Sequence, residues 1–131
     1  MAQDHPTAFD NVATRKTIIR ELNDTLRSNI TRPGHNRIVM TAGVAALIGD
    51  VSLFRGFRQR AELLRLVRDF DTFDGDNDPH GEHDFGIVLF EDATFYWKID
   101  YYDRALAFGS DDPANPAVTT RVLTILLAEE Y

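Results

Sequence analysis

Acidic and imidazole side chains gather in one stretch of the chain, from Asp71 to Asp103. These 33 positions hold ten of the 21 acidic residues and two of the four histidines. Most of them flank a pattern typical of a β-hairpin, whose strands would hold the side chains in fixed positions. Such groups could bind a metal ion, exchange protons, or present a negative surface to a partner.

A metal site is one interpretation of the two histidines. Imidazole and carboxylate groups suit zinc, manganese or iron, and the candidate ligands are His80, Glu82, His83 and Asp84. In a strand His83 would point away from the acids beside it, so the site needs Asp100 or Asp103 from the neighbouring strand. This interpretation predicts a divalent metal as cofactor and a metal-dependent hydrolase, in which one carboxylate acts as the general base.

A calcium loop is a weaker interpretation of the acids that precede them. Asp74, Asp76 and Asp78 have the spacing that opens an EF-hand. That loop also needs glycine at its sixth position and glutamate at its twelfth, and Pro79 and Phe85 stand there instead. The match fails where geometry and charge matter most, so an acidic turn in water is the better prediction.

A structural polar hub explains the same residues without any reaction. Asp84, at a strand entrance, would accept hydrogen bonds from backbone N–H groups of the preceding turn. His83 would pair with Asp100 or Asp103, and a tyrosine hydroxyl would complete the network, because half-buried polar groups need partners. The predicted members are His83, Asp84, Tyr101 and Tyr102.

Other catalytic patterns are missing from the sequence. The chain has no G-x-S-x-G elbow, no phosphate-binding G-x-x-x-x-G-K-[ST] loop and no G-x-G-x-x-G motif, so three large enzyme classes have no support. It also has no cysteine, which excludes disulfides, thiol nucleophiles and cysteine-type zinc sites. An enzyme is therefore not the favoured class.

The charge is divided unevenly along the chain. Residues 1–70 hold 11 Lys and Arg against 7 Asp and Glu, whereas residues 71–131 hold 3 against 14, within a net charge of −7. A negative surface attracts basic protein surfaces rather than nucleic acid. The candidate partner-binding residues are Asp74, Asp76, Asp78, Glu82, Asp100, Asp103, Asp111 and Asp112.

The elements that position these residues predict an α+β fold. Apolar spacing predicts helices over residues 15–28, capped by Thr14, and over residues 52–69, capped by Asp50 or Ser52. A strand is expected over residues 37–41, a short helix over 42–48, a hairpin with strands 84–90 and 95–102, and a last helix over 117–129. The predicted core lists Phe54, Phe57, Leu64, Trp97, Ile99, Leu123 and Leu126.

One domain accounts for the whole length. Residues 1–13 are expected to form a flexible arm and residues 14–131 one α+β domain, with a small antiparallel sheet packed against three main helices. No apolar window is long enough to cross a membrane, and no signal peptide is visible in the sequence, so we expect a cytoplasmic protein.

Five segments of the chain have distinctive sequences: GEHDFG (Gly81–Gly86), WKIDYYD (Trp97–Asp103), RVLTILLAEEY (Arg121–Tyr131), NDTLR (Asn23–Arg27) and VMTAGV (Val39–Val44). These segments resemble a bacterial family of small proteins that is classified only as a domain of unknown function. Residues 50–60 depart most from the family pattern. The resemblance implies a bacterial protein with a link to plasmids and other mobile elements, and it transfers no catalytic residue.

These observations together favour an acidic protein-binding or regulatory module. Given the resemblance, the partner could be a nucleic-acid-binding or defence protein that the module inhibits, with the acids imitating phosphates. The metal-dependent hydrolase is the alternative. The sequence leaves the oligomeric state open.

Overall fold

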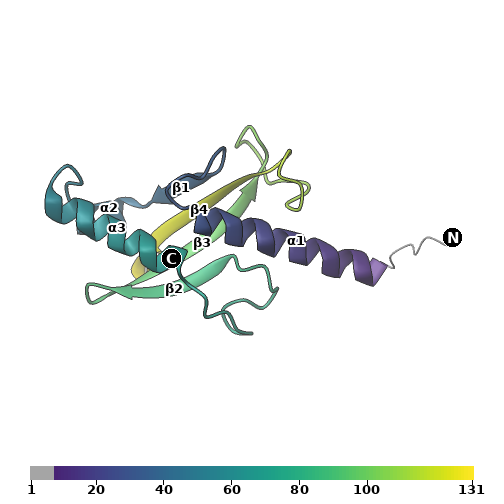
Figure 1. Ribbon diagram of the computed structural model, residues 1–131, viewed down its shortest axis with the longest axis horizontal. Coiled ribbons are helices and arrows are strands. Elements are labelled where there is room, and N and C mark those ends of the chain that lie inside the picture. The colour runs from purple at the N-terminus through teal and green to yellow at the C-terminus, as the bar shows by residue number, and fades with distance from the viewer. Residues whose placement is uncertain (1–7) are drawn as a thin grey trace.

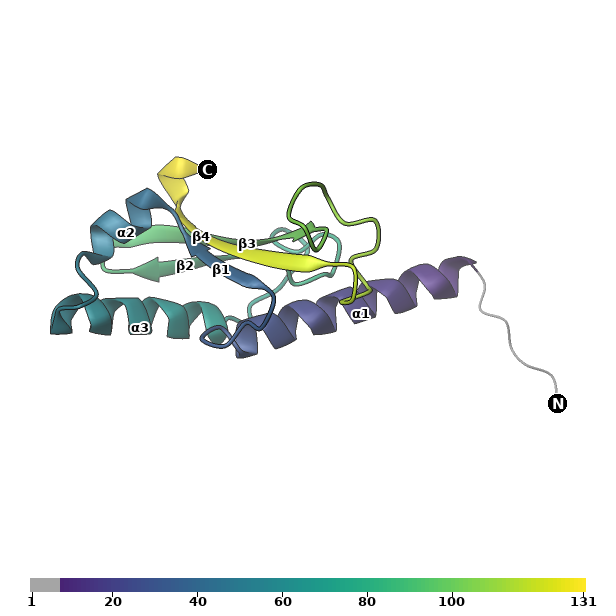
Figure 2. The same ribbon diagram turned by 90° about the horizontal axis from the view of Figure 1, so that it is seen from above.

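A computed structural model describes residues 8–131, and it confirms an α+β fold with a small, mostly antiparallel sheet (Figures 1 and 2). The elements in chain order are α1 (Ala8–Ser28), β1 (Arg37–Met40), α2 (Ala42–Ile48), α3 (Phe54–Arg68), β2 (Phe85–Phe90), β3 (Ala93–Tyr102), β4 (Thr120–Leu127) and a short 3-10 helix, η1 (Ala128–Glu130). Figure 2 shows α1 and α3 along one face of the sheet, with α1 extending beyond its end.

The four strands lie in the order β1-β4-β3-β2. β2 and β4 each pair antiparallel with β3, while β1 runs parallel to β4, so the sheet is mixed. The hairpin connection is shorter than predicted, because Phe90 pairs directly with Ala93. Glu91 and Asp92 adopt positive φ angles of 50° and 63°, the geometry of a tight turn whose twist matches the strands it joins.

The predicted last helix over residues 117–129 is wrong, because most of that segment forms β4, a central strand of the sheet. Val118, Val122, Leu123 and Leu126 have helical spacing, but Leu123 and Ile125 also alternate with Val122 and Thr124. The structure uses the second pattern: Leu123 and Ile125 are fully buried, and Val122 and Thr124 are only half-buried. Pairing with β1 and β3 on both sides overrides the local preference.

Helix α1 is longer than predicted. It begins at Ala8, so Thr14 lies inside the helix and does not cap it. Of the arm expected over residues 1–13, residues 8–13 are helical and residues 1–7 lie outside the described part of the chain. The core side of α1 carries Ile19 and Leu26, whereas Ile18 is exposed.

The predicted short helix is confirmed as α2, where the Thr41 hydroxyl accepts from the backbone N–H of Val44. Helix α3 is confirmed but starts at Phe54, two residues later than predicted, and no side chain caps it. The Asp50 carboxylate instead accepts from the backbone N–H and hydroxyl of Ser52, at 2.9 and 2.7 Å. Asp50 therefore stabilises the turn before α3 rather than its first turn.

The core lies between the sheet and the helices. Phe95, Trp97, Leu123 and Ile125 from the two central strands are fully buried. Trp97 packs so closely on β2 that a Cβ atom at Gly86 would lie 2.3 Å from its Nε1, so only glycine fits opposite the indole. No helix within residues 8–131 is long and apolar enough to cross a membrane.

Candidate functional site

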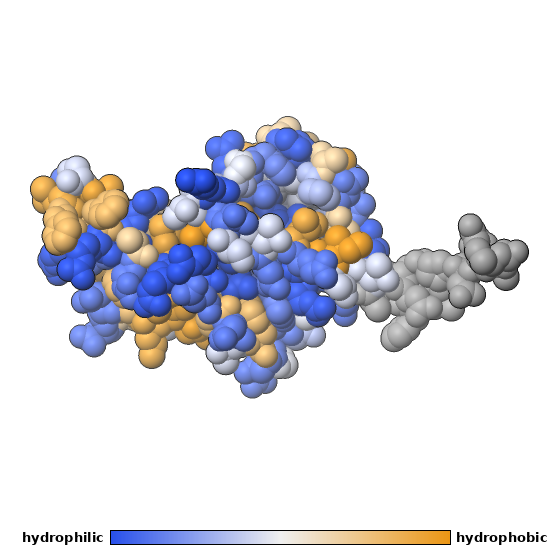
Figure 3. Space-filling view, viewed as in Figure 1, coloured by the Kyte–Doolittle hydropathy of each residue, from blue (hydrophilic) through white to orange (hydrophobic). Residues whose placement is uncertain are grey.

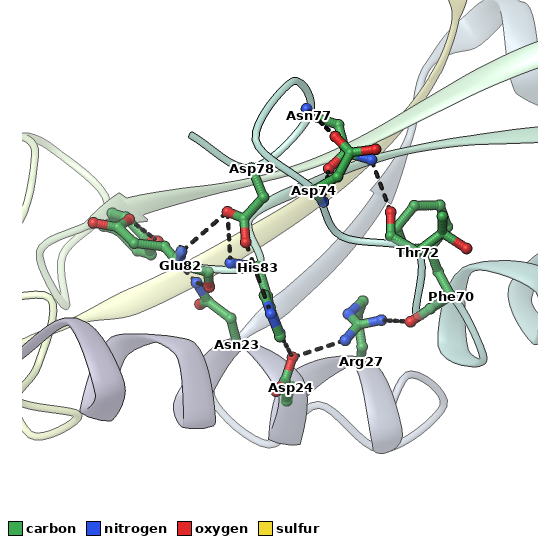
Figure 4. A network of polar contacts seen from close by, with 11 residues as sticks. Asn23, Asp24, Arg27, Phe70, Thr72, Asp74, Asn77, Asp78, Glu82 and His83 are labelled. Carbon is green, nitrogen blue, oxygen red and sulfur yellow. Dashed lines mark hydrogen bonds and ion pairs between the residues drawn. The ribbon is translucent and has the colours of Figure 1, made fainter. Parts of the chain in front are cut away.

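Polar side chains meet where α1, β3, β4 and the loop before β2 come together (Figure 4). We call this cluster the polar hub, and its members are Asn23, Asp24, Arg27, Asp78, Glu82, His83, Tyr101 and Arg121. Asn23, Arg27 and Arg121 are at most 5% exposed. Buried groups of this kind are costly unless each has a partner.

The first half of the hub joins four segments that are far apart in the chain. Arg121 Nε donates to Asn23 Oδ1 at 2.7 Å, and Asn23 Nδ2 donates to Tyr101 Oη at 2.8 Å and to the Glu82 carbonyl at 3.0 Å. Tyr101 Oη in turn donates to Glu82 Oε2 at 2.8 Å. One buried amide therefore links a cation on β4 to an anion in the loop.

Burial sets the protonation chemistry of this half. It raises the pKa of the Tyr101 phenol, and the hydrogen bond to Glu82 raises that pKa further. Burial also lowers the pKa of the Arg121 guanidinium, while Tyr101 and Glu82 act in the opposite direction. Tyr101 stays protonated at neutral pH and its hydroxyl donates a hydrogen bond to Glu82, so it is a structural donor rather than a base.

The second half of the hub is built around His83. Its Nδ1 lies 2.8 Å from Asp24 Oδ1, and the same oxygen accepts from Arg27 at 2.8 Å. The imidazole stacks on Phe73 with 3.8 Å between ring centroids and 5° between planes. The Arg27 guanidinium lies over the rings of Phe73 and Trp97, at 5.1 and 5.0 Å, and donates to the Phe70 carbonyl.

The hub predicted from the sequence has the wrong partners. His83 pairs with Asp24 on α1 and not with Asp100 or Asp103. The Asp100 carboxylate accepts from Lys98 at 2.7 Å, and Asp103 accepts from the backbone N–H of Ala107 at 2.9 Å. Both carboxylates therefore bind groups that are close to them in the chain, and neither pairs with His83.

The side chains of Tyr101 and Tyr102 point to opposite faces of the sheet, because side chains alternate along β3. Tyr101 enters the hub as predicted, whereas Tyr102 is 36% exposed and has no place there. Asp84 is half-buried at the start of β2, and burial, with the nearby charge of Glu82, raises its pKa. Asp84 thus lies beside the hub, and its ionised form is the unfavourable one.

The loop from residue 71 to residue 84 is organised by its own acids. Asp78 is only 8% exposed, and its Oδ1 accepts from the backbone N–H groups of Glu82 and His83, at 3.0 and 3.1 Å. Asp74 Oδ1 accepts from the backbone N–H groups of Asp76 and Asn77. Of the three aspartates in this loop that were predicted to bind a partner, Asp78 is therefore buried, while Asp74 and Asp76 are exposed.

Two further predicted partner-binding acids lie in the loop after β3. Asp112 forms an ion pair with Arg15 of α1 at 2.8 Å, whereas Asp111 is exposed. Of the eight predicted residues, only Asp74, Asp76 and Asp111 are exposed.

The histidines do not form a metal site in the described part of the chain. Among the side chains that the structure describes, no group of three or more His, Cys, Asp or Glu could hold a metal ion. His83 faces Asp24 through Nδ1 and lies 3.7 Å from Asp78 Oδ2 through Nε2, while His80 is exposed. The ligands proposed from the sequence, His80, His83 and Asp84, do not converge.

Sequence reasoning missed the α1 and β4 members of the hub. Asn23 and Arg27 lie on the same side of α1 as Ile19 and Leu26, since all four are buried. Polar residues within an apolar helical stripe were the available signal for a buried network. Arg121 was not recognised as a member of the hub because its segment was predicted to form a helix.

A second unusual surface lies at the opposite end of the sheet, around the turn between α2 and α3. We call it the apolar end, and its large side chains are between 47% and 75% exposed: Leu47, Val51, Leu53, Phe54 and Phe57. Figure 3 shows hydrophobic atoms gathered at this end of the molecule. The prediction that Phe54 and Phe57 belong to the core is wrong, since Leu63, Leu64 and Val67 carry the buried side of α3.

The chain belongs to a family described as protein of unknown function (DUF3768), whose model matches residues 40–130. This confirms the resemblance to a domain of unknown function. Comparisons with curated proteins and with solved structures find no match. The family match covers α2, α3 and strands β2 to β4, and it leaves α1 outside.

Proposed function

We propose that the protein is a non-enzymatic protein-binding module that docks its acidic end on the basic surface of a partner. The acidic end comprises residues 71–84 and 103–112. The observation that carries the proposal is topological: β3 runs antiparallel to β2 and β4, so both segments lie at the same end of the sheet (Figures 1 and 2). Acidic residues that are far apart in the sequence therefore contribute to one negative electrostatic potential at this end of the sheet.

The internal contacts of the acidic end support a fixed surface rather than a loose tail. Asp74 and Asp78 hold the first loop through backbone N–H groups, and Asp103 holds the second. The exposed Asp76 and Asp111 lie on these two loops. A preorganised negative surface favours rapid association with a basic partner and loses that advantage as salt rises.

The partner we propose is a nucleic-acid-binding or defence protein in a bacterial cytoplasm, which a mobile element would benefit from inhibiting. The carboxylates would take the place of phosphates on its basic surface. Direct binding of nucleic acid is disfavoured, since the net charge is −7 and phosphates would be repelled. The exposed large side chains of the apolar end also favour a binding module, because such patches mark interaction sites.

The metal-dependent hydrolase ranks below the binding module. It needs three ligands and an open position for water, and the described side chains provide no such group.

The test compares capture of basic proteins from a bacterial lysate by three forms of the protein. One form combines Asp71→Asn, Asp76→Asn and Asp111→Asn at the acidic end. The matched control removes the same charge elsewhere, with Glu91→Gln, Asp92→Asn and Glu129→Gln, which are all exposed. We expect the wild type and the control to retain the same basic protein at low salt, and the acidic-end variant to lose it.

Two further results define the outcome. If the carboxylates imitate phosphates, a short DNA duplex should displace the retained protein, and raised salt should release it. Retention that survives high salt, or equal retention by the acidic-end variant, would contradict the proposal.

A further inference from the structure

Strand β2 ends the sheet on one side, and no described element among residues 8–131 pairs with its outer edge. Its sequence, FGIVLF, has no charged residue and no proline. Edge strands of soluble proteins normally carry such residues, because the free row of N–H and C=O groups can pair with another chain. β1, at the other edge, has only four residues and includes Arg37.

The direction of each backbone group on β2 follows from one contact. The Ile99 N–H donates to the Asp84 carbonyl at 2.8 Å, so the backbone of Asp84 faces β3. Backbone groups alternate along a strand, so the next three that face β3 belong to Gly86, Val88 and Phe90. Those that face outward belong to Phe85, Ile87 and Leu89.

The side chains on the same alternation are exposed as well. Ile87 and Leu89 are 44% and 75% exposed, while Val88 between them is buried in the core. The outer edge of β2 therefore offers free hydrogen-bonding groups together with uncovered apolar side chains.

We propose that two copies of the protein pair through β2 in antiparallel orientation, with a two-fold axis at Ile87. In this register Ile87 faces its own symmetry mate, and Phe85 of each copy faces Leu89 of the other. All three outward residues then form hydrogen-bonded pairs, giving about six backbone hydrogen bonds and one continuous sheet. A register centred on Val88 would pair only two of them.

The position of helix α3 also favours a second copy as the partner of the open β2 edge. A groove beside β2 is lined by Phe54, Arg58 and Glu62 of α3 together with Phe90 and Glu91, so this side of α3 lies next to the open edge. Two-fold pairing of β2 would bring the two α3 helices together in antiparallel orientation. The exposed side chains of α3 and its C-cap include both signs of charge, Arg58 and Arg65 beside Glu62 and Asp69, so the approach of the two helices is not opposed by a surface of one sign.

The first experiment follows the mass of the full-length protein by sedimentation equilibrium, from low to high micromolar concentration. We expect a monomer–dimer equilibrium that Ile87→Lys weakens at least tenfold, because it places two ammonium groups opposite each other. The control is Val39→Lys on the other edge strand, where the side chain is 43% exposed. It should dimerise like the wild type.

Thermal unfolding followed by circular dichroism verifies that both variants fold. A wild type that stays monomeric throughout would overturn the proposal, and so would an equal loss of dimer in both lysine variants.

The second experiment tests the register by oxidation, using the absence of natural cysteines. Cα atoms of a hydrogen-bonded antiparallel pair lie about 5.5 Å apart, within disulfide range. Ile87→Cys should therefore form a disulfide-linked dimer readily. Leu89→Cys should not, since its symmetry mate would lie four residues along the partner strand. Equal or faster cross-linking of Leu89→Cys would rule out the register centred on Ile87.

Discussion

The His83 ring is held by two contacts, with the carboxylate of Asp24 and with the ring of Phe73. Its φ angle of 55° lies in the left-handed region, which is uncommon for residues other than glycine. The backbone accepts this conformation because Asp78 binds the N–H groups of Glu82 and His83. His83, which the sequence suggested as a metal ligand, thus connects the loop before β2 to α1.

We predict that His83→Ala lowers stability by about 1–3 kcal/mol, because it removes the ring stacking and leaves Asp24 without one of its partners. His83→Phe should recover part of the loss, since it keeps the stacking on Phe73 and removes only the polar contact. Urea unfolding of the three proteins measures both effects. A metal role predicts a different pattern, in which added zinc or manganese raises the melting temperature of the wild type alone.

Asp84 provides a test of pH dependence. Burial and the charge of Glu82 raise its pKa in the folded protein, so the folded state holds this proton more tightly than the unfolded chain does. The stabilising contribution is therefore fully present below the unfolded pKa of about 3.9, and is lost as pH rises through the raised folded value. At neutral pH the ionised Asp84 is a cost.

Asp84→Asn should accordingly stabilise the protein at pH 7 and bring no gain at pH 3. The check is urea unfolding of both proteins at the two pH values. A stability difference that is the same at both values would show that ionisation of Asp84 is not the cause.

At the level of elements, the local signals were sufficient for most of the fold. The apolar spacing of α1 and α3, the β-branched residues of β1 and the aromatic alternation of β3 all predicted the correct element. They failed at β4, where a period of two and a helical period were both present. The distinction depends on Met40 and Trp97, which flank Ile125 in the sheet and are remote from it in the chain.

The same limit applies to the hub. His83 and Tyr101 were predicted as members from the local density of acids and tyrosines. Their partners on α1 are Asp24, which lies 59 residues before His83, and Asn23, which lies 78 residues before Tyr101. Local patterns identify that a polar residue needs a partner, but only the packing of α1 on the sheet selects which one. The prediction that Phe54 and Phe57 are buried was wrong for a related reason. An apolar stripe on a helix is covered only where the sheet extends beneath it.

Thr124→Ala distinguishes a strand from a helix at β4. Thr124 pairs with Val39 on one side and Lys98 on the other. In a central strand, loss of the β-branched side chain should destabilise the protein by up to about 1 kcal/mol. In a helix the same substitution would be stabilising, since alanine has the higher helix propensity. The sign of the change in urea unfolding decides between the two.

On the scale of the whole molecule, the boundary of the family match does not coincide with the boundary of the fold. The match begins at residue 40, yet α1 supplies Leu26 to the core, Asn23 to Arg121 and Arg27 to the face of Trp97. Without α1, the guanidinium of Arg121 would lose its amide partner and one side of the sheet would lose its cover. The family region therefore depends on the helix that precedes it.

We predict that a fragment of residues 35–131, which retains β1, does not form the native core alone. Trp97 is the only tryptophan and is fully buried in the intact protein, so its fluorescence reports directly on the docking of α1. The fragment should show a red-shifted emission and no cooperative melting, and adding a peptide of residues 8–34 should restore both. A peptide carrying Asn23→Ala and Leu26→Ser is the control, because it keeps the helix but lacks the amide and the apolar contact. Native fluorescence in the fragment by itself would contradict the prediction, since the sheet, α2 and α3 would then suffice to bury Trp97 and to satisfy Arg121.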